Sequence, residues 1–131
     1  MAEISLLVTS LLFGGTVLYA FGFATFVFTA LPADTAGPLI RRAFPHFYLF
    51  VLGTSTAAAV LAAYFDAQAA LCLVVIAAST AYARQILMPA INAATDAGAK
   101  QKFKRLHGLS VVITLLHIVI AAYVILRLAR M

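Results

Sequence analysis

The three histidines of this sequence decide what metal or proton chemistry it could support. His117 follows His107 by ten residues in one helical stretch, which places it about 15 Å further along the helix axis. His46 and His107 each stand at the start of an apolar run, and we expect both at the same end of the molecule. Because imidazole holds haem iron or a metal ion only together with further ligands, His46 and His107 are the candidate cofactor ligands and His117 a more distant third.

His117 falls near the middle of an apolar stretch, where an ionisable side chain is a functional candidate by default. A neutral imidazole that is hydrogen-bonded to a neighbouring hydroxyl or carbonyl group would fit the same position, and both interpretations stay open. Spacings of three and four residues predict that one stripe of the helix forms the inner wall of a bundle. This stripe contains His107, Ser110, Thr114, His117 and Ala121, and the opposite side contains Val112, Val119, Ala122 and Leu126.

Arg84 is the other residue that is costly to place in an apolar stretch. We expect its guanidinium either to pair with Asp34 or Asp96, or to extend to lipid phosphate. The apolar stretches contain no Asp, Glu or Lys, so the parts of a carboxylate proton relay or sodium site are missing. The sequence also contains no Ser/His/Asp set, HExxH, CxxC or glycine-rich phosphate loop. We therefore expect no enzymatic activity, no catalytic residues and no dedicated metal site.

The elements that carry these residues follow from the composition of the 131-residue chain, which is 65% hydrophobic and only 10% charged. Such a chain cannot cover a water-soluble globule with polar side chains. A membrane-spanning helix needs roughly 20 apolar residues. We predict an all-α, integral membrane, antiparallel four-helix bundle that forms a single domain over residues 1–131. The predicted spans are residues 4–31, 47–65, 69–87 and 109–126.

Basic residues gather in the two connections that an even number of spans places on one side of the membrane. Cytoplasmic segments of membrane proteins carry an excess of Lys and Arg, so we expect these connections in the cytoplasm and both termini outside it. We expect the membrane to be a bacterial inner membrane or an organellar membrane. We expect this cluster to bind anionic lipid headgroups or a partner protein, and not nucleic acid, which needs a solvated basic face. The cluster consists of Arg41, Arg42, Lys100, Lys102, Lys104 and Arg105.

Small residues predict how the helices approach one another, because membrane helices associate through close contact of small side chains. In the first span Gly15, Gly22, Thr25 and Thr29 recur at helical spacing, and we expect this face to pack inward. Between Pro89 and Gly108, residues 91–95 are compatible with continuation of the third helix beyond a proline kink.

Several of these residues also resemble a known family pattern. The stretches Phe28-Thr29-Ala30-Leu31-Pro32 and Phe44-Pro45-His46-Phe47-Tyr48, with Gly37 between them, resemble the Leu-Pro, Gly and Phe-Pro-x-Tyr-Phe elements of the transmembrane protein 205-like family. Arg84 followed by Pro89 is similar to its Asn-x-Arg-x-x-x-x-Pro element, with Tyr82 in place of asparagine. The segment from Phe103 to Ser110 is similar to its Phe-x-x-x-His-Gly-x-Ser signature.

This resemblance implies a small four-helix membrane protein whose signature residues converge at one membrane face. The residues are Pro32, Pro45, Arg84, Pro89, His107 and Ser110. The chain is more distantly similar to copper-resistance-D-like and protoporphyrinogen-oxidase-like membrane bundles, some of which bind haem. It lacks the intramembrane His and Lys pair expected of the latter, and that activity is not carried over.

We expect a non-enzymatic membrane protein that serves as an accessory or interaction subunit of a larger complex, for example a respiratory or photosynthetic assembly, or that associates with itself. One alternative is a haem- or metal-binding membrane protein that uses His46 and His107, with haem b or a metal ion as the cofactor. Another is a small transporter or a drug- or metal-tolerance factor. No cofactor is expected on the first interpretation.

Overall fold

The computed structural model describes residues 1–131 as a set of helices without strands. Four of the segments are long and apolar enough to cross a membrane: residues 2–30, 33–62, 67–96 and 100–129. The prediction of an all-α four-helix membrane bundle is therefore confirmed. The elements in chain order are α1 (Ala2–Val17), η1 (Leu18–Phe23), α2 (Ala24–Ala30), α3 (Ala33–Ala62), α4 (Ala67–Tyr82), η2 (Ala83–Leu87), α5 (Met88–Asp96) and α6 (Lys100–Ala129).

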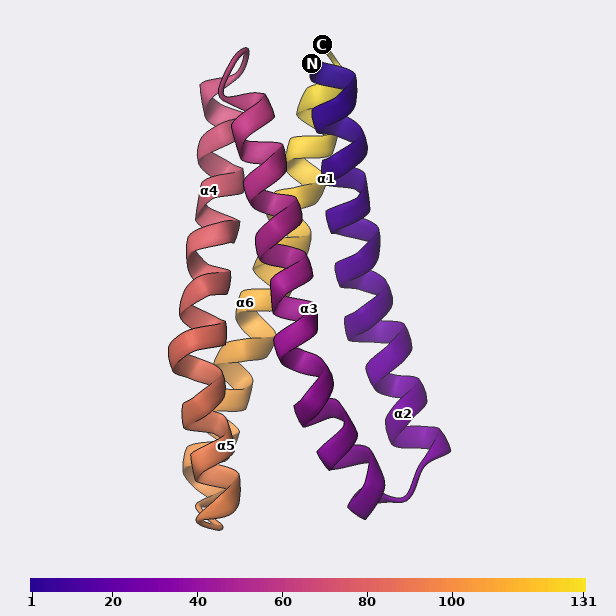
Figure 1. The fold of residues 1–131 in the computed structure, drawn as a ribbon, viewed down its shortest axis with the longest axis vertical. Helices are drawn as coiled ribbons and strands as arrows, with labels where there is room; N and C mark the ends of the chain where they lie inside the picture. Colours follow the sequence, from indigo (N-terminus) through magenta and orange to yellow (C-terminus); the bar gives the residue numbers. More distant parts are fainter.

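The helices form an antiparallel ring in which α1 packs against α3 and α6, and α4 packs against the same two helices (Figure 1). Both chain termini and the α3–α4 turn lie at one end, which we call the terminal end. The α2–α3 and α5–α6 turns lie at the other, the basic end, because the basic cluster belongs to these connections.

Three of the four helices extend beyond the spans predicted from hydropathy. The second begins at Ala33, before Arg41 and Arg42, and contains Pro38 and Pro45. The third continues through Pro89 to Asp96, which confirms the expected continuation over residues 91–95. Hydropathy detects only the apolar part of a helix, so it misses helical turns that carry charged side chains.

The two π-helical turns η1 and η2 interrupt the first and third spans. Each is a short stretch with the i→i+5 backbone hydrogen bonds of a π-helix, over Leu18–Phe23 in η1 and over Ala83–Leu87 in η2. Such segments are rare and local, and they change the direction of the side chains that follow. Each therefore divides its span into a part toward the terminal end and a part toward the basic end.

The inward face of the first span differs from the predicted one. Gly22, Thr25 and Thr29 are exposed, and Gly15 is half-buried with the ring of Phe50 directly above it. The buried positions, Ser5, Thr9, Leu12 and Thr16, lie on another face of the helix. Hydroxyl groups tolerate burial there because they are bonded: Thr9 and Thr16 donate to the carbonyl oxygens of Ser5 and Leu12, each at 2.7 Å, and Ser5 donates to Ala58 at 3.3 Å.

The buried apolar residues form two separate groups. The main core joins all four spans and has 15 buried residues, among them Leu12, Val51, Leu73 and Val124. A satellite core contains only Val27, Ala36 and Ile40, which come from α2 and the beginning of α3. Phe44 packs against both groups.

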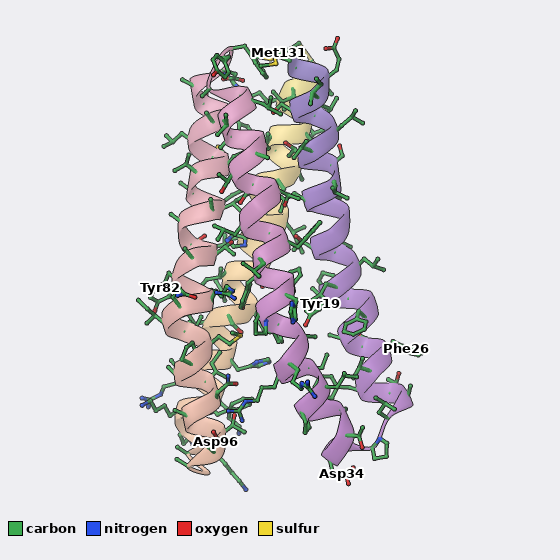
Figure 2. All side chains as sticks on the ribbon, viewed as in Figure 1. Tyr19, Phe26, Asp34, Tyr82, Asp96 and Met131 are labelled. Atoms are coloured by element: carbon green, nitrogen blue, oxygen red, sulfur yellow. The ribbon has the colours of Figure 1, made fainter.

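Few side chains are buried in the bundle, and Phe26 and Tyr82, for example, project outward from their helices (Figure 2). Only 27 of the 131 residues are buried, and large apolar residues such as Leu7, Phe26 and Leu71 are at least 65% exposed. A water-soluble protein does not present apolar patches of this extent, whereas lipid tails cover them without cost. The molecule is an integral membrane protein.

Candidate functional site

The polar pair at mid-depth consists of Ser79 on α4 and His117 on α6. The Ser79 Oγ and His117 Nε2 atoms lie 2.6 Å apart. The Ser79 hydroxyl is also 2.7 Å from the carbonyl oxygen of Val75 and is oriented to donate to it. If the hydroxyl proton goes to Val75, the Ser79 oxygen accepts from Nε2–H of a neutral imidazole. Of the two sequence interpretations of His117, the structure contains the hydrogen-bonded one.

The inner stripe predicted on α6 is confirmed over most of its length. Ser110, His117 and Ala121 are buried and Thr114 is half-buried, whereas Val112, Val119 and Leu126 on the other side are more than half exposed. His107 departs from the prediction: it is exposed, and its ring stacks on Phe103 with 5.4 Å between centroids.

Arg84 lies on η2 and donates from Nε to the carbonyl oxygen of Pro45 on α3, at 3.3 Å. Its Nη1 donates to the neighbouring Gln85 side chain at 2.8 Å. The predicted pairing of Arg84 with Asp34 or Asp96 is wrong. Asp96 forms an ion pair with Arg41. The π-helical turn directs the Arg84 side chain at the backbone of α3 instead.

Asp96 at the end of α5 forms its ion pair with Arg41 of α3. The two guanidinium Nη atoms donate to the two carboxylate oxygens at 2.8 and 3.0 Å. Both side chains are largely exposed, at 43% for Arg41 and 61% for Asp96. Asp34 and Asp96 lie at the basic end on different helices (Figure 2), and only the second meets an arginine.

The candidate cofactor ligands His46 and His107 are both exposed, on α3 and α6. No hydrogen bond or ring contact joins them, and no group of three or more His, Cys, Asp or Glu side chains surrounds either. The Nε2 atom of His117 is hydrogen-bonded to Ser79. The three candidate ligands therefore have separate surroundings: His107 stacks on Phe103, and His117 is bonded to Ser79.

Four members of the basic cluster, Lys100, Lys102, Lys104 and Arg105, lie in the first turns of α6 beside the α5–α6 turn, and the other two lie on α3. Two open concave surfaces of about 700 and 330 Å³ flank this turn and share Gly98, Ala99 and Lys100. None of Arg42, Lys100, Lys102, Lys104 or Arg105 forms a salt bridge with an acidic side chain. Their charge is therefore available to an external anion.

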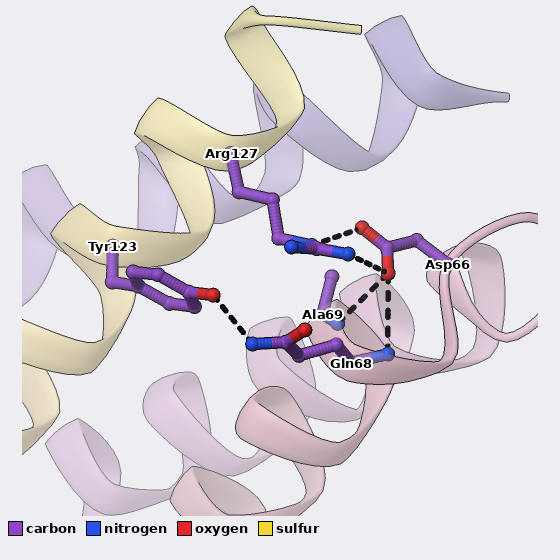
Figure 3. A network of polar contacts seen from close by, with 5 residues as sticks. All are labelled: Asp66, Gln68, Ala69, Tyr123 and Arg127. Atoms are coloured by element: carbon purple, nitrogen blue, oxygen red, sulfur yellow. Dashed lines mark hydrogen bonds and ion pairs between the residues drawn. The ribbon is translucent and has the colours of Figure 1, made fainter.

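The terminal end contains a polar network that the sequence did not predict (Figure 3). Arg127 of α6 donates twice to Asp66, which also caps α4 by accepting from the backbone N–H groups of Gln68 and Ala69. Gln68 Nε2 donates to the Tyr123 hydroxyl at 2.6 Å. The Arg127 guanidinium holds the pKa of the Asp66 carboxyl below its ordinary value, against the opposing effect of burial. The signal available in the sequence was an Asp at a helix start, a preferred N-cap.

An aromatic cluster surrounds Tyr19 of η1. Its ring stacks on Phe47 with 4.0 Å between centroids and 6° between planes, and meets Phe23 and Phe44 at 5.4 Å. The Tyr19 hydroxyl is buried and has no hydrogen-bond partner, which is unusual for a buried polar group. Sequence reasoning missed this group because the spacing of Tyr19 gives no sign that a π-helical turn directs it at α3.

Residues 7–100 match the family described as "Domain of unknown function (DUF4149)". The chain belongs to the DUF4149 family. No curated protein and no solved structure matches it.

The DUF4149 match covers the first three spans and ends at Lys100, where α6 begins. Pro32, Pro45, Arg84 and Pro89 therefore lie within it, and His107, Ser110 and His117 lie beyond it. Pro32 precedes α3, and Pro89 lies at the start of α5, directly after the π-helical turn η2 and within the continuous helix of residues 67–96.

Proposed function

We propose that this DUF4149 protein is a non-enzymatic membrane protein that works by association within the bilayer, as an accessory or interaction subunit of a larger complex. The observation that supports this best is that the two polar side chains that are costliest to place in an apolar stretch, His117 and Arg84, are hydrogen-bonded to neighbouring helices. His117 is bonded to Ser79, and Arg84 to the backbone of α3. These side chains link helices, which is a structural use of intramembrane polar groups.

The surface that we propose for the partner is the outer face of the first span. The part of this span toward the basic end, α2, packs against η1 and α3. The exposed positions of the span include Gly22 in η1 and Thr25 and Thr29 in α2, whose small side chains allow close approach of a second helix. A Cβ atom at Gly22 would meet only the flexible side chain of Leu18, at 3.1 Å, so a larger residue fits the fold but blocks the face.

Crosslinking in native membranes tests this proposal with Gly22→Leu as the variant. The matched control is Ala78→Leu, which places the same leucine side chain at an exposed position of α4. We expect the wild type and Ala78→Leu to form crosslinks to a distinct membrane protein or to a second copy, and Gly22→Leu to lose them. Recovery of the free monomer alone from the wild type, or equal crosslinking by both variants, would contradict the proposal.

The haem or metal alternative is distinguished by the absorption spectrum and metal content of the protein purified in detergent. A colourless, metal-free preparation is expected. A Soret band or a stoichiometric metal that disappears in His107→Ala, but persists in a control with an exposed apolar residue replaced, would overturn the proposal in favour of cofactor binding by His46 and His107.

We propose anionic lipid headgroups as the ligand of the basic cluster. The unpaired cations of the α5–α6 turn surround two open concavities, and each Lys or Arg near an anionic surface contributes about 1 kcal/mol to attraction. Native mass spectrometry with phosphatidylglycerol and phosphatidylcholine tests this. Neutralising Lys102, Lys104 and Arg105 to Gln should abolish retention of the anionic lipid, whereas Arg130→Gln should not. Equal retention of both lipids would contradict it.

The resemblance to the transmembrane protein 205-like family stays a prediction, as does the placement of the basic end in the cytoplasm. Transport or drug and metal tolerance has no structural observation in its favour here.

A further inference from the structure

The segment formed by residues 24–44 packs as a unit of its own. Its satellite core of Val27, Ala36 and Ile40 shares no buried residue with the main core. Helices α5 and the start of α6, by contrast, contribute Ile91 and Leu106 to the surroundings of the main core. Figure 1 shows α2 and the beginning of α3 leaning away from α5 at the basic end. The half of the bundle near the basic end therefore consists of two bodies, which are residues 24–44 and the pair formed by α5 and the start of α6.

Both chain connections from this segment to the rest of the molecule are irregular. On one side is the π-helical turn η1, and on the other is Pro45 within α3. Proline has no N–H group, so the carbonyl oxygen of Arg41 four residues earlier loses its helical partner. Tyr19 of η1 stacks on Phe47, and Arg84 of η2 bonds to Pro45, so the irregular turns lie at one level. Bends in helices concentrate at such positions.

One ion pair joins the segment to α5, the bidentate contact between Arg41 and Asp96. It crosses between the two bodies near the basic end. Because both side chains are largely exposed, water competes with the pair, and its contribution is small. Such a contact holds one arrangement without preventing another.

The Tyr19 hydroxyl supplies an independent observation at the same level. A buried hydroxyl without a partner raises the free energy of the arrangement that contains it. The Tyr19 ring contacts Phe44 of the segment, with 5.4 Å between centroids, and Phe47 beyond Pro45. The arrangement in the structure thus carries an energetic cost at the level where the segment joins the rest of the bundle.

We propose that residues 24–44 move as one body, hinged at η1 and Pro45, and that the Arg41–Asp96 pair holds this body closed against α5. Opening separates the α2–α3 pair from the α5–α6 pair and gives lateral access from the bilayer at the basic end. The terminal half of the bundle keeps its arrangement throughout. This inference is independent of the proposed accessory function.

Distance measurements between spin labels in lipid nanodiscs test the movement. Labels are placed at Thr35→Cys and Gln101→Cys in a Cys72→Ser background, all three in the otherwise complete protein. Arg41→Gln should shift this distance distribution to longer values and broaden it. The charge reversal Arg41→Asp with Asp96→Arg should restore the wild-type distribution.

A control pair at Leu7→Cys and Leu71→Cys reports on the terminal half, and its distances should stay unchanged in every variant. An unaltered Thr35–Gln101 distribution in Arg41→Gln, equal broadening of both label pairs, or failure of the charge reversal to restore the distribution would overturn the inference.

The hinge itself is tested by Pro45→Ala in the Arg41→Gln background. Alanine supplies the missing N–H to the Arg41 position carbonyl and stiffens α3. The broadened distribution should narrow. If Pro45→Ala leaves it as broad as before, the hinge does not lie at Pro45 and the proposed movement is wrong.

Discussion

Arg127 donates two hydrogen bonds to the Asp66 carboxylate at the terminal end, from Nε to Oδ2 at 2.6 Å and from Nη2 to Oδ1 at 3.1 Å. The side chain of Asp66 is only 4% exposed, whereas that of Asp96 in the other interhelical pair is 61% exposed. Removing one partner of an ion pair that is shielded from water lowers protein stability more than removing one partner of an exposed pair. The ion pair at the terminal end is therefore the more costly of the two to break.

Replacing Asp66 separates its two roles. Asp66→Asn keeps an N-cap for α4 but removes the charge that Arg127 needs, and Asp66→Ala removes both. We expect thermal unfolding in detergent at pH 7 to rank the wild type above Asp66→Asn and Asp66→Ala lowest. The step between the variants should be about 1 kcal/mol, the usual value of an N-cap. Equal stability of the two variants would show that the cap contributes nothing.

Acidification should destabilise the protein through the same residue. The pKa of folded Asp66 lies below its ordinary value, chiefly because of the Arg127 hydrogen bond, whereas the unfolded carboxyl titrates near pH ~3.9. The stabilisation by Asp66 is therefore fully present above that pH and disappears as the pH falls through the folded pKa. Unfolding measured between pH 6 and pH 2 (roughly the range over which carboxyls titrate) should show less acid sensitivity for Asp66→Asn than for the wild type. Identical pH dependence would contradict this.

The Ser79–His117 contact should show a measurable coupling. Interhelical hydrogen bonds in membranes contribute about 0.6 kcal/mol on average and about 1.7 kcal/mol at most. A double-mutant cycle with Ser79→Ala and His117→Leu, followed by reversible unfolding in detergent, should give a coupling free energy in this range. Because the cycle cancels changes in packing that are common to both backgrounds, a value of zero would mean that the bond contributes nothing to stability.

Two glycines make a matched pair for backbone effects. Gly98 has a φ of 67°, and Gly53 lies within α3; a Cβ atom at either position would meet no atom within 4 Å. Gly98→Ala should destabilise by about 1–2 kcal/mol, the cost of left-handed backbone for an L-residue. Gly53→Ala should stabilise by about 0.5–1 kcal/mol by reducing the entropy of the unfolded chain. Thermal unfolding of both variants checks the opposite signs, and a shared sign would contradict the assignment.

Orientation can be tested by chemical labelling in sealed membranes. In a Cys72→Ser background, a cysteine at Gln101 should react with an impermeant reagent only from the cytoplasmic side, because cytoplasmic connections carry the excess of Lys and Arg. A cysteine at Tyr64, in the α3–α4 turn, should react only from the other side. The reverse pattern would place the termini in the cytoplasm.

The fold was predictable because it depends on the composition of whole segments of the chain and not on single residues. Four apolar stretches and an even number of crossings require a helical bundle, since only bonded backbone is stable in lipid. The polar spacing on α6 also predicted the inward position of His117 correctly, because polar groups avoid lipid. These conclusions depend on many residues, so one unusual position does not change them.

Details that depend on one side chain were not predictable. The small residues predicted that Gly22 and Thr25 lie on an inward face, but both are exposed. Thr9 and Thr16 are buried instead, and each donates a hydrogen bond to a carbonyl oxygen of its own helix. The choice of partner for Arg84 depended on a π-helical turn, which a regular 3.6-residue period does not anticipate. Likewise, Arg127 and Asp66 are 61 residues apart and meet only once the helices are arranged.

The separation of the two cores has a consequence for folding cooperativity. Phe44 is the apolar side chain that packs against both, so it couples two units that otherwise differ greatly in buried area. Free energies of local opening vary across a protein according to such packing. Backbone amides of α2 and the first turns of α3 should therefore exchange with deuterium before those of α4, and truncation of Phe44 should divide one unfolding event into two.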